Sequence, residues 1–193
     1  LLVRAHGQAA HAATPALGTN AVTRMAAALH ALDANPDAVG AALAPLFRDA
    51  LLEPATVAIG TTIVGGGIRA VSADAGGRRV ERSGINVVAD WCEATIDCRH
   101  PRAADAAGDI REQVAAAVER IACDLAGLPS DALAVSVLGG GPPCAILDAA
   151  AEGPSDPLVG AVIGNGSAVS GFDPWVETAP GGTDATVMIN RGR

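Results

Sequence analysis

Within residues 87–99, the side chains from Cys92 to Arg99 alternate between apolar and polar. A period of two predicts a β-strand, because successive side chains of a strand point to opposite faces of its sheet. One face of this strand should therefore be buried, while the other looks onto solvent or a cleft. The apolar face carries Cys92, Ala94, Ile96 and Cys98, and the polar face carries Glu93, Thr95, Asp97 and Arg99.

Other segments show the spacing of helices and further strands. Apolar residues recur at helical spacing after Asn20, and Asn35-Pro36 should end that helix. A helix over 38–52 is less favoured, because Pro45 lies in its middle. The strands expected are 1–10, 56–64, 87–99 and 132–138, and the helices expected are 20–35, 38–52 and 110–125.

The order strand, helix, strand, strand, helix, strand predicts an α+β domain over residues 1–142. Two helices on one face of a four-stranded antiparallel sheet, the ferredoxin-like arrangement, satisfy this order. Residues 68–84 are polar and rich in Arg, and we interpret them as an exposed hairpin or loop.

The tail over residues 143–193 differs from the preceding domain. It contains one short apolar helix near 158–163 and one expected strand at 187–189. A segment of this size cannot bury a core of its own. We therefore expect it to pack on something that is absent from this chain.

The composition excludes several classes of protein. The chain has 193 residues, a net charge of -8, and thirteen basic residues that are all Arg. An acidic chain with scattered arginines argues against a nucleic-acid surface, and no run reaches the roughly 18 apolar residues of a membrane span. No secretory signal is visible at Leu1. The expectation of free thiols, given next, favours the cytoplasm. The cysteines form no CxxC pair and are expected to be buried free thiols: Cys92, Cys98, Cys123 and Cys144.

Four local features could carry chemistry, and each has an ordinary alternative. His11, among small residues past a strand end, could donate a hydrogen bond to an oxyanion, or could be a loop residue without a role. Asn86 could be a site residue or a turn residue. Arg99 suits a substrate carboxylate, or could pair with Asp97 or Glu93. The segment 180–184 (Pro-Gly-Gly-Thr-Asp) could hold an anion or form a tight turn.

The sequence contains no complete metal site. There is no HExxH motif, and His100 has no partner at zinc-ligand spacing. The glycine-rich segments 65–67 and 139–141 lack the Lys and the Ser or Thr of a phosphate-binding loop, and no Gly-x-Ser-x-Gly nucleophile motif occurs.

Taken in order, three motifs resemble those of the M20 family of metallopeptidases and amidohydrolases. The first runs from Gly7 through His11-Ala12-Ala13, Pro15 and Gly18 to Asn20-Ala21. The second is Gly66-Gly67, followed by Asn86-Val87-Val88 and by Ala94-Thr95-Ile96-Asp97-Cys98-Arg99. The third is Gly181-Gly182-Thr183-Asp184-Ala185. The matches extend from about residue 4 to residue 190.

The resemblance implies a function and a role for each motif. Members of the family hydrolyse an amide bond of an N-acyl amino acid or peptide with two zinc ions and a Glu general base. The residues 1–142 would be the lid and dimerisation domain, and 143–193 part of an α/β catalytic domain. His11 resembles the lid histidine that stabilises the oxyanion in the partner subunit of a homodimer, and Asn86 resembles a second residue of that site. Arg99 resembles the arginine that binds the substrate carboxylate, which Gly181, Gly182 and Thr183 would also contact.

The sequence also departs from the family pattern. The segments that should carry the metal ligands and the general base are absent, so this chain alone is expected to bind no catalytic zinc and to be inactive. Position 89 is Ala where the family usually has Pro, and residues 68–84 resemble an insertion. A non-catalytic module that dimerises or binds a small carboxylate is the alternative.

Overall fold

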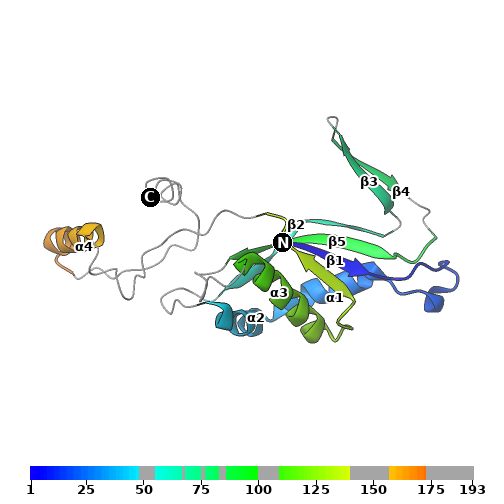
Figure 1. Ribbon diagram of the computed structural model, residues 1–193, viewed down its shortest axis with the longest axis horizontal. Coiled ribbons are helices and arrows are strands. Elements are labelled where there is room, and N and C mark those ends of the chain that lie inside the picture. Colours follow the sequence, from blue (N-terminus) through cyan, green and yellow to red (C-terminus); the bar gives the residue numbers. More distant parts are fainter. Residues whose placement is uncertain are drawn as a thin grey trace.

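The computed structural model describes residues 1–47, 55–66, 68–74, 77–82, 86–99, 109–139 and 157–172. Its centre is a four-stranded antiparallel sheet of order β2-β5-β1-β6, as predicted for an α+β domain. Figure 1 shows the helices α1, α2 and α3 on one face of this sheet. The strands are β1 (Leu2–His6), β2 (Thr56–Gly65), β5 (Trp91–Arg99) and β6 (Leu133–Ser136), and the helices are α1 (Ala21–Ala34), α2 (Pro36–Leu43) and α3 (Ile110–Ala126).

The hydrophobic core lies between these helices and the sheet. In β5, Cys92, Ala94 and Ile96 are buried and Cys98 is partly buried, which confirms the alternation predicted for this strand. The same rule holds in β1, where the buried residues alternate with exposed polar ones. The remaining core residues include Val3, Ala5, Met25, Leu29, Leu32, Val39, Leu43, Val114, Val118 and Ile121.

The thiols are part of this core. Cys92 and Cys123 are free and buried, and Cys98 is free and partly buried. Burial raises the pKa of Cys98 to about 11 and also raises the pKa of Cys92. Because the thiolate is the reactive form, these three side chains are poor nucleophiles. Cys144 lies outside the described residues.

The helix ends follow from local chemistry. The side chain of Asn20 accepts hydrogen bonds from the backbone N–H groups of Val22 and Thr23 and so caps α1. In α3, Asp109 caps the start, and Gly127 ends the helix with a left-handed φ of 62°. Hydrogen bonds from Arg111 lower the pKa of Asp109 to about 2.

The structure has a shorter helix than the one predicted over 38–52, and it begins earlier. Pro36 follows the end of α1, as predicted, but it is also the first residue of α2. A proline is well tolerated in the first turn of a helix. The helix ends at Leu43, and Pro45 lies in a short 3-10 turn (Ala44–Leu46). A proline cannot donate the backbone hydrogen bond that would continue an α-helix.

The segment interpreted as a hairpin or loop is a hairpin. Strands β3 (Ile68–Asp74) and β4 (Gly77–Arg82) pair with each other as a second, two-stranded sheet. Figure 1 shows that this hairpin rises from the sheet on the side opposite the helices. It leaves β2 at Gly66, whose φ of 76° turns the chain away.

The tail contains α4 (Pro157–Ser170), which is longer than the helix expected near 158–163. Figure 1 shows α4 apart from the sheet. Three large apolar side chains on and just after α4 are at least 61% exposed: Val162, Val169 and Phe172. The expected strand at 187–189 lies outside the described residues. None of the helices in the described ranges is long and apolar enough to cross a membrane.

Candidate functional site

The structure brings His11 and Asn86 together beyond one end of the sheet. His11 forms an isolated antiparallel bridge with Val87. On either side of this bridge, the N–H of Val88 donates to the carbonyl of Ala10 and the N–H of Ala12 donates to the carbonyl of Asn86, both at 2.8 Å. Two of the predicted site residues, 75 positions apart in sequence, therefore share one small backbone ladder.

The hydrogen bonds around His11 define which ring nitrogen carries the proton. The backbone N–H of Ala13 donates to Nδ1 of His11 at 3.1 Å, so the neutral ring carries its hydrogen on Nε2. Nε2 lies 3.3 Å from Nδ2 of the Asn86 carboxamide. A half-turn of that carboxamide presents its oxygen to Nε2–H. Both side chains are exposed, so Nε2–H is also accessible to a ligand.

The glycines around His11 hold the loop close to the sheet. A Cβ on Gly7 would lie 2.3 Å from the carbonyl oxygen of Thr19, and one on Gly18 would lie 2.7 Å from the carbonyl oxygen of Gln8. Gln8 and Thr19 exchange both of their backbone hydrogen bonds across this contact. The first motif therefore consists largely of residues that shape the loop, while His11 itself is left exposed.

Position 89, where the sequence departs from the family pattern, has a structural role. Ala89 is 4% exposed. Its carbonyl oxygen accepts the N–H of Ala21 at 2.9 Å, which joins the segment after Asn86 to the start of α1. This bond uses only the backbone carbonyl, which a Pro would also offer, so it does not depend on the departure at this position.

Arg99 lies at the opposite end of β5 from this site. Its Nη2 lies 2.7 Å from Oδ2 of Asp97, so the ion pair considered as an alternative is present. Asp97 accepts this hydrogen bond and raises the pKa of Arg99 above its usual value. The guanidinium side chain remains 62% exposed, which leaves it available to another carboxylate.

The span of β5 separates Arg99 from the other candidates. Strand β5 runs from Trp91 to Arg99, and Asn86 precedes it. Eight steps at about 3.3 Å each place the two strand ends roughly 26 Å apart. An extended dipeptide spans only about 7 Å. One small ligand therefore cannot contact both His11 and Arg99 of the same chain.

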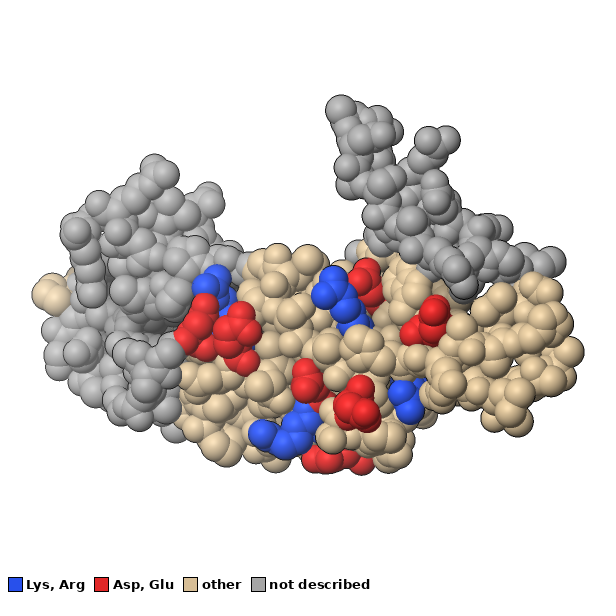
Figure 2. Space-filling model, turned by 45° about the vertical axis from the view of Figure 1, so that its right-hand side comes forward, with Lys and Arg blue, Asp and Glu red and all other residues tan. Residues whose placement is uncertain are grey.

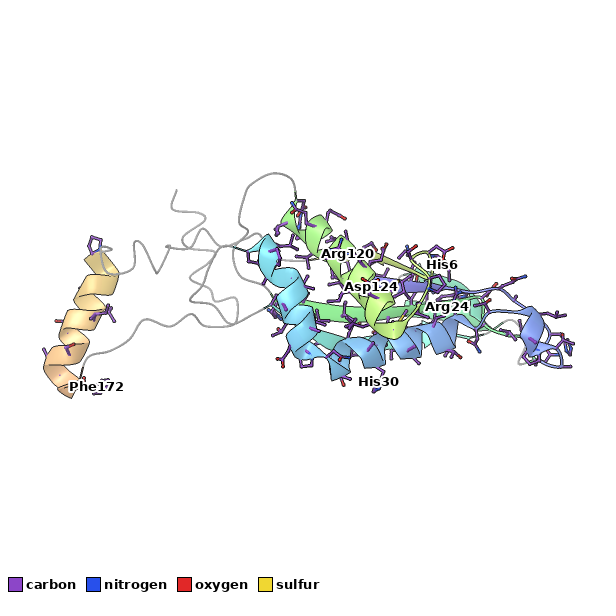
Figure 3. The ribbon with its side chains drawn as sticks, turned by 90° about the horizontal axis from the view of Figure 1, so that it is seen from below. His6, Arg24, His30, Arg120, Asp124 and Phe172 are labelled. Carbon is purple, nitrogen blue, oxygen red and sulfur yellow. The ribbon has the colours of Figure 1, made fainter. Side chains whose placement is uncertain are left out.

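The polar face of the sheet carries contacts that the sequence did not predict. Arg4 Nε donates to Oε1 of Glu93 at 2.7 Å, between neighbouring strands. A separate contact joins helix α1 to the sheet: Nη1 of Arg24 donates to the carbonyl oxygen of His6 at 2.7 Å, and Figure 3 labels both residues. Figure 2 shows acidic and basic side chains interspersed on the visible face. Cross-strand pairs of this kind depend on the register of the strands, which no local pattern encodes.

The remaining candidates and a metal site are not found among the described residues. Gly181, Gly182 and Thr183 lie outside the described residues. Across the described ranges, no three His, Cys, Asp or Glu side chains are grouped so that they could hold a metal ion. The described residues thus do not fit the two zinc ions that the resemblance implies, and the chemistry derived below uses only the groups of this chain.

The comparison with family models agrees with the first two motifs. A family model described as a peptidase dimerisation domain matches residues 1–124. Among solved structures, a tripeptidase from Staphylococcus aureus subsp. aureus Mu50 is similar, with 19% identity, a TM-score of 0.48, and coverage of 99% of this chain and 40% of that chain. An aminobenzoyl-glutamate utilization protein from Klebsiella pneumoniae is similar at 22% identity and a TM-score of 0.47, covering 98% of this chain and 39% of that one. This chain thus spans about two fifths of their length. No curated protein sequence matches it.

Proposed function

Because this chain belongs to the M20 peptidase family through its dimerisation domain, we propose that it is part of a metal-dependent amidohydrolase. Residues 1–142 form its lid and dimerisation domain, and residues 143–193 belong to its catalytic domain. The enzyme cleaves an amide bond of an N-acyl amino acid or peptide-like substrate with a free carboxylate, in the cytoplasm. Two zinc ions, if other parts of the parent protein hold them, would supply the activated water.

His11 stabilises the negative charge that develops on the substrate carbonyl oxygen. Its Nε2–H is a fixed donor, since Ala13 holds Nδ1 as an acceptor. A preoriented donor favours the oxyanion over the ground-state carbonyl, because the charge appears only during the reaction. Asn86 keeps the imidazole oriented before the substrate binds and then contacts the substrate itself.

Arg99 binds the free carboxylate of the substrate, and the loop of Gly181, Gly182 and Thr183 contacts the same group. The planar guanidinium can donate two parallel hydrogen bonds to a carboxylate. Its distance from His11 supports a homodimer, in which each active site combines Arg99 of one lid with His11 and Asn86 of the other. This separation is the observation that carries the proposal.

The lid offers an edge through which two copies can associate. Strand β2 is an edge of the sheet and is ten residues long, whereas the other edge strand β6 has four. Ile63 on β2 is 58% exposed, and Val22 on α1 is 38% exposed. An unpaired strand with apolar side chains beside it favours pairing with a second strand.

Mixing two inactive variants of the full-length protein tests this arrangement. His11→Ala and Arg99→Ala homodimers should each have low activity. In a mixed dimer, one site receives both substitutions and the other receives none. Random re-association of equal amounts makes half of the dimers mixed, so about a quarter of wild-type activity should return.

The outcomes separate the alternatives. No recovery after mixing, with exchange verified by mass spectrometry of tagged subunits, would mean that His11 and Arg99 serve the same chain's site or none. A full-length protein that hydrolyses no N-acyl amino acid or peptide would favour the non-catalytic module that dimerises or binds a carboxylate.

A further inference from the structure

Among the described residues, strand β6 (Leu133–Ser136) forms one edge of the sheet and pairs only with β1. An edge strand has backbone N–H and C=O groups that point away from the sheet, and these groups can pair with a strand of another molecule. Strand addition at β6 would let further copies of the chain join a dimer. The partners of the outward N–H groups of β6 therefore bear on how many copies assemble.

The register of β6 against β1 identifies these outward groups. The N–H of His6 donates to the carbonyl of Ala132 at 2.9 Å, so these two residues occupy a hydrogen-bonded position of the ladder. Hydrogen-bonded and non-hydrogen-bonded pairs alternate along an antiparallel ladder. Leu133 and Val135, one and three positions further along, therefore direct their backbone groups away from β1.

Helix α3 supplies an acceptor for each of these two N–H groups. The N–H of Val135 donates to Oε2 of Glu119 at 2.8 Å. Burial raises the pKa of Cys123, and a hydrogen bond from the backbone of Leu133 to this thiol acts in the opposite direction. Both outward N–H groups of β6 thus have a side-chain partner in the same chain.

The spacing of the two acceptors matches the spacing of the two donors. Glu119 and Cys123 are four residues apart on α3, which corresponds to a rise of about 6 Å along the helix. Leu133 and Val135 are two residues apart, which corresponds to about 6.6 Å along the strand. One turn of α3 therefore lies in register with the outward groups of β6, so the two contacts support each other.

Glu119 occupies the side of α3 that lies beside the sheet edge. The residues that follow the two acceptors along the helix, Arg120 and Asp124, are exposed, and Figure 3 labels both. Glu119 is instead partly buried. A strand arriving at β6 would have to bring a carbonyl oxygen to the N–H of Val135, where the carboxylate oxygen already lies. Charged side chains directed at a sheet edge oppose pairing in this way.

We propose that Glu119, together with Cys123, closes the β6 edge to strand addition by further copies of this chain, so that assembly ends with two copies. The inference rests on the homodimer of the proposed function, and it adds the residue that limits the size of that assembly. It leaves β2 as the edge of the sheet that is available to a second copy.

The test measures the assembly of the full-length protein by sedimentation velocity. Glu119→Ala removes the acceptor, whereas Glu119→Gln keeps a side-chain oxygen that can accept the same N–H. Glu112→Ala is the matched control, because it removes the same type of side chain from an exposed position on the same helix. The protein concentration is varied over about a hundredfold, since association follows mass action.

We expect the wild type, Glu119→Gln and Glu112→Ala to remain dimers at every concentration. Glu119→Ala should form larger species as the concentration rises, with at least about a twofold increase in average mass, because the joining of two dimers doubles the mass. A double variant, Glu119→Ala with Val135→Pro, places the larger species at β6. The proline removes the outward N–H itself, which an edge strand tolerates, and should restore the dimer.

The outcomes separate edge pairing from a loss of folding. Aggregation caused by unfolding would persist in the double variant, and this result would overturn the inference. A folded Glu119→Ala variant that stays a dimer, or a wild type that itself forms larger species, would also overturn it. A wild type that is monomeric at every concentration would contradict the homodimer of the proposed function. In that case, self-association of Glu119→Ala alone supports the closed edge, and its absence contradicts it.

Discussion

The imidazole of His11 and the carboxamide of Asn86 lie 3.3 Å apart, between Nε2 and Nδ2, although 75 positions separate them in the sequence. Backbone pairing at Val87 holds the two segments together, and the N–H of Ala13 fixes the ring tautomer. Both side chains are exposed, while their backbones are tied to the folded domain. This combination of a fixed backbone and an open donor suits a group that must meet a ligand without reorganising.

His11→Ala should lower kcat of the full-length protein by about 10²–10³, as the loss of one oxyanion donor does in other hydrolases. The side chain is exposed, so far-UV circular dichroism and the melting temperature should stay close to wild type. His30→Ala is the matched control, since His30 is an exposed histidine on α1 (Figure 3). Unchanged turnover in His11→Ala would remove this residue from the mechanism.

The sequence predicted the two residues of this site separately but did not predict their contact. Periodicity is local information, and it sufficed for β5 and α3, whose apolar residues recur regularly. The His11–Asn86 contact depends on an isolated bridge between two irregular segments, and its register is fixed by tertiary packing. The N–H of Ala13 is a backbone donor, so no side-chain pattern could have indicated it.

The sequence predicted that Arg99 lies on the polar face of β5. It left two roles open for this residue, a contact with a substrate carboxylate and an ion pair with Asp97 or Glu93. The structure contains its ion pair with Asp97, yet this pair is exposed and therefore contributes little to stability. The separation of Arg99 from His11 follows from the length of β5 and the position of Asn86 before it, and it could have been calculated from the sequence. The prolines were harder to interpret, since Pro36 begins a helix as well as following one.

Arg99→Lys should raise KM for substrates with a free carboxylate, with a smaller effect on kcat. Lysine keeps the charge but cannot form two parallel hydrogen bonds with a carboxylate, so an increase of about tenfold is expected. Steady-state kinetics of the full-length protein give both constants. Asp97→Asn is the comparison, because it removes the competing carboxylate and should leave KM equal or lower. A raised KM in Asp97→Asn, with no change in Arg99→Lys, would assign the ion pair a purely structural role.

The cysteine thiols should resist alkylation in the folded protein. Burial raises the pKa of Cys98 to about 11, so about one thiol in a thousand is ionised at pH 8. The labelling rate of Cys98 with iodoacetamide should therefore increase about tenfold per pH unit until the pH approaches that value.

The measurement uses a Cys144→Ser background and peptide mass spectrometry to separate the sites. The same protein in urea is the control, because unfolding returns each thiol to its ordinary pKa and should accelerate labelling at pH 8. Labelling of folded and unfolded protein at equal rates would contradict the burial of Cys98.

Gly7→Ala should destabilise the domain, whereas Gly139→Ala should not. A Cβ at position 7 would lie 2.3 Å from the carbonyl oxygen of Thr19, and 2.8 Å from that of Ala89, so backbone atoms on both sides must move. Such overpacking costs about 1–3 kcal/mol in the free energy of unfolding. At Gly139 no atom of the described residues lies within 4 Å of the added Cβ, so the same substitution should be neutral or slightly stabilising. Urea denaturation of the two variants gives both values, and equal stability would mean that the loop carrying His11 does not need its close contact with the segment before α1.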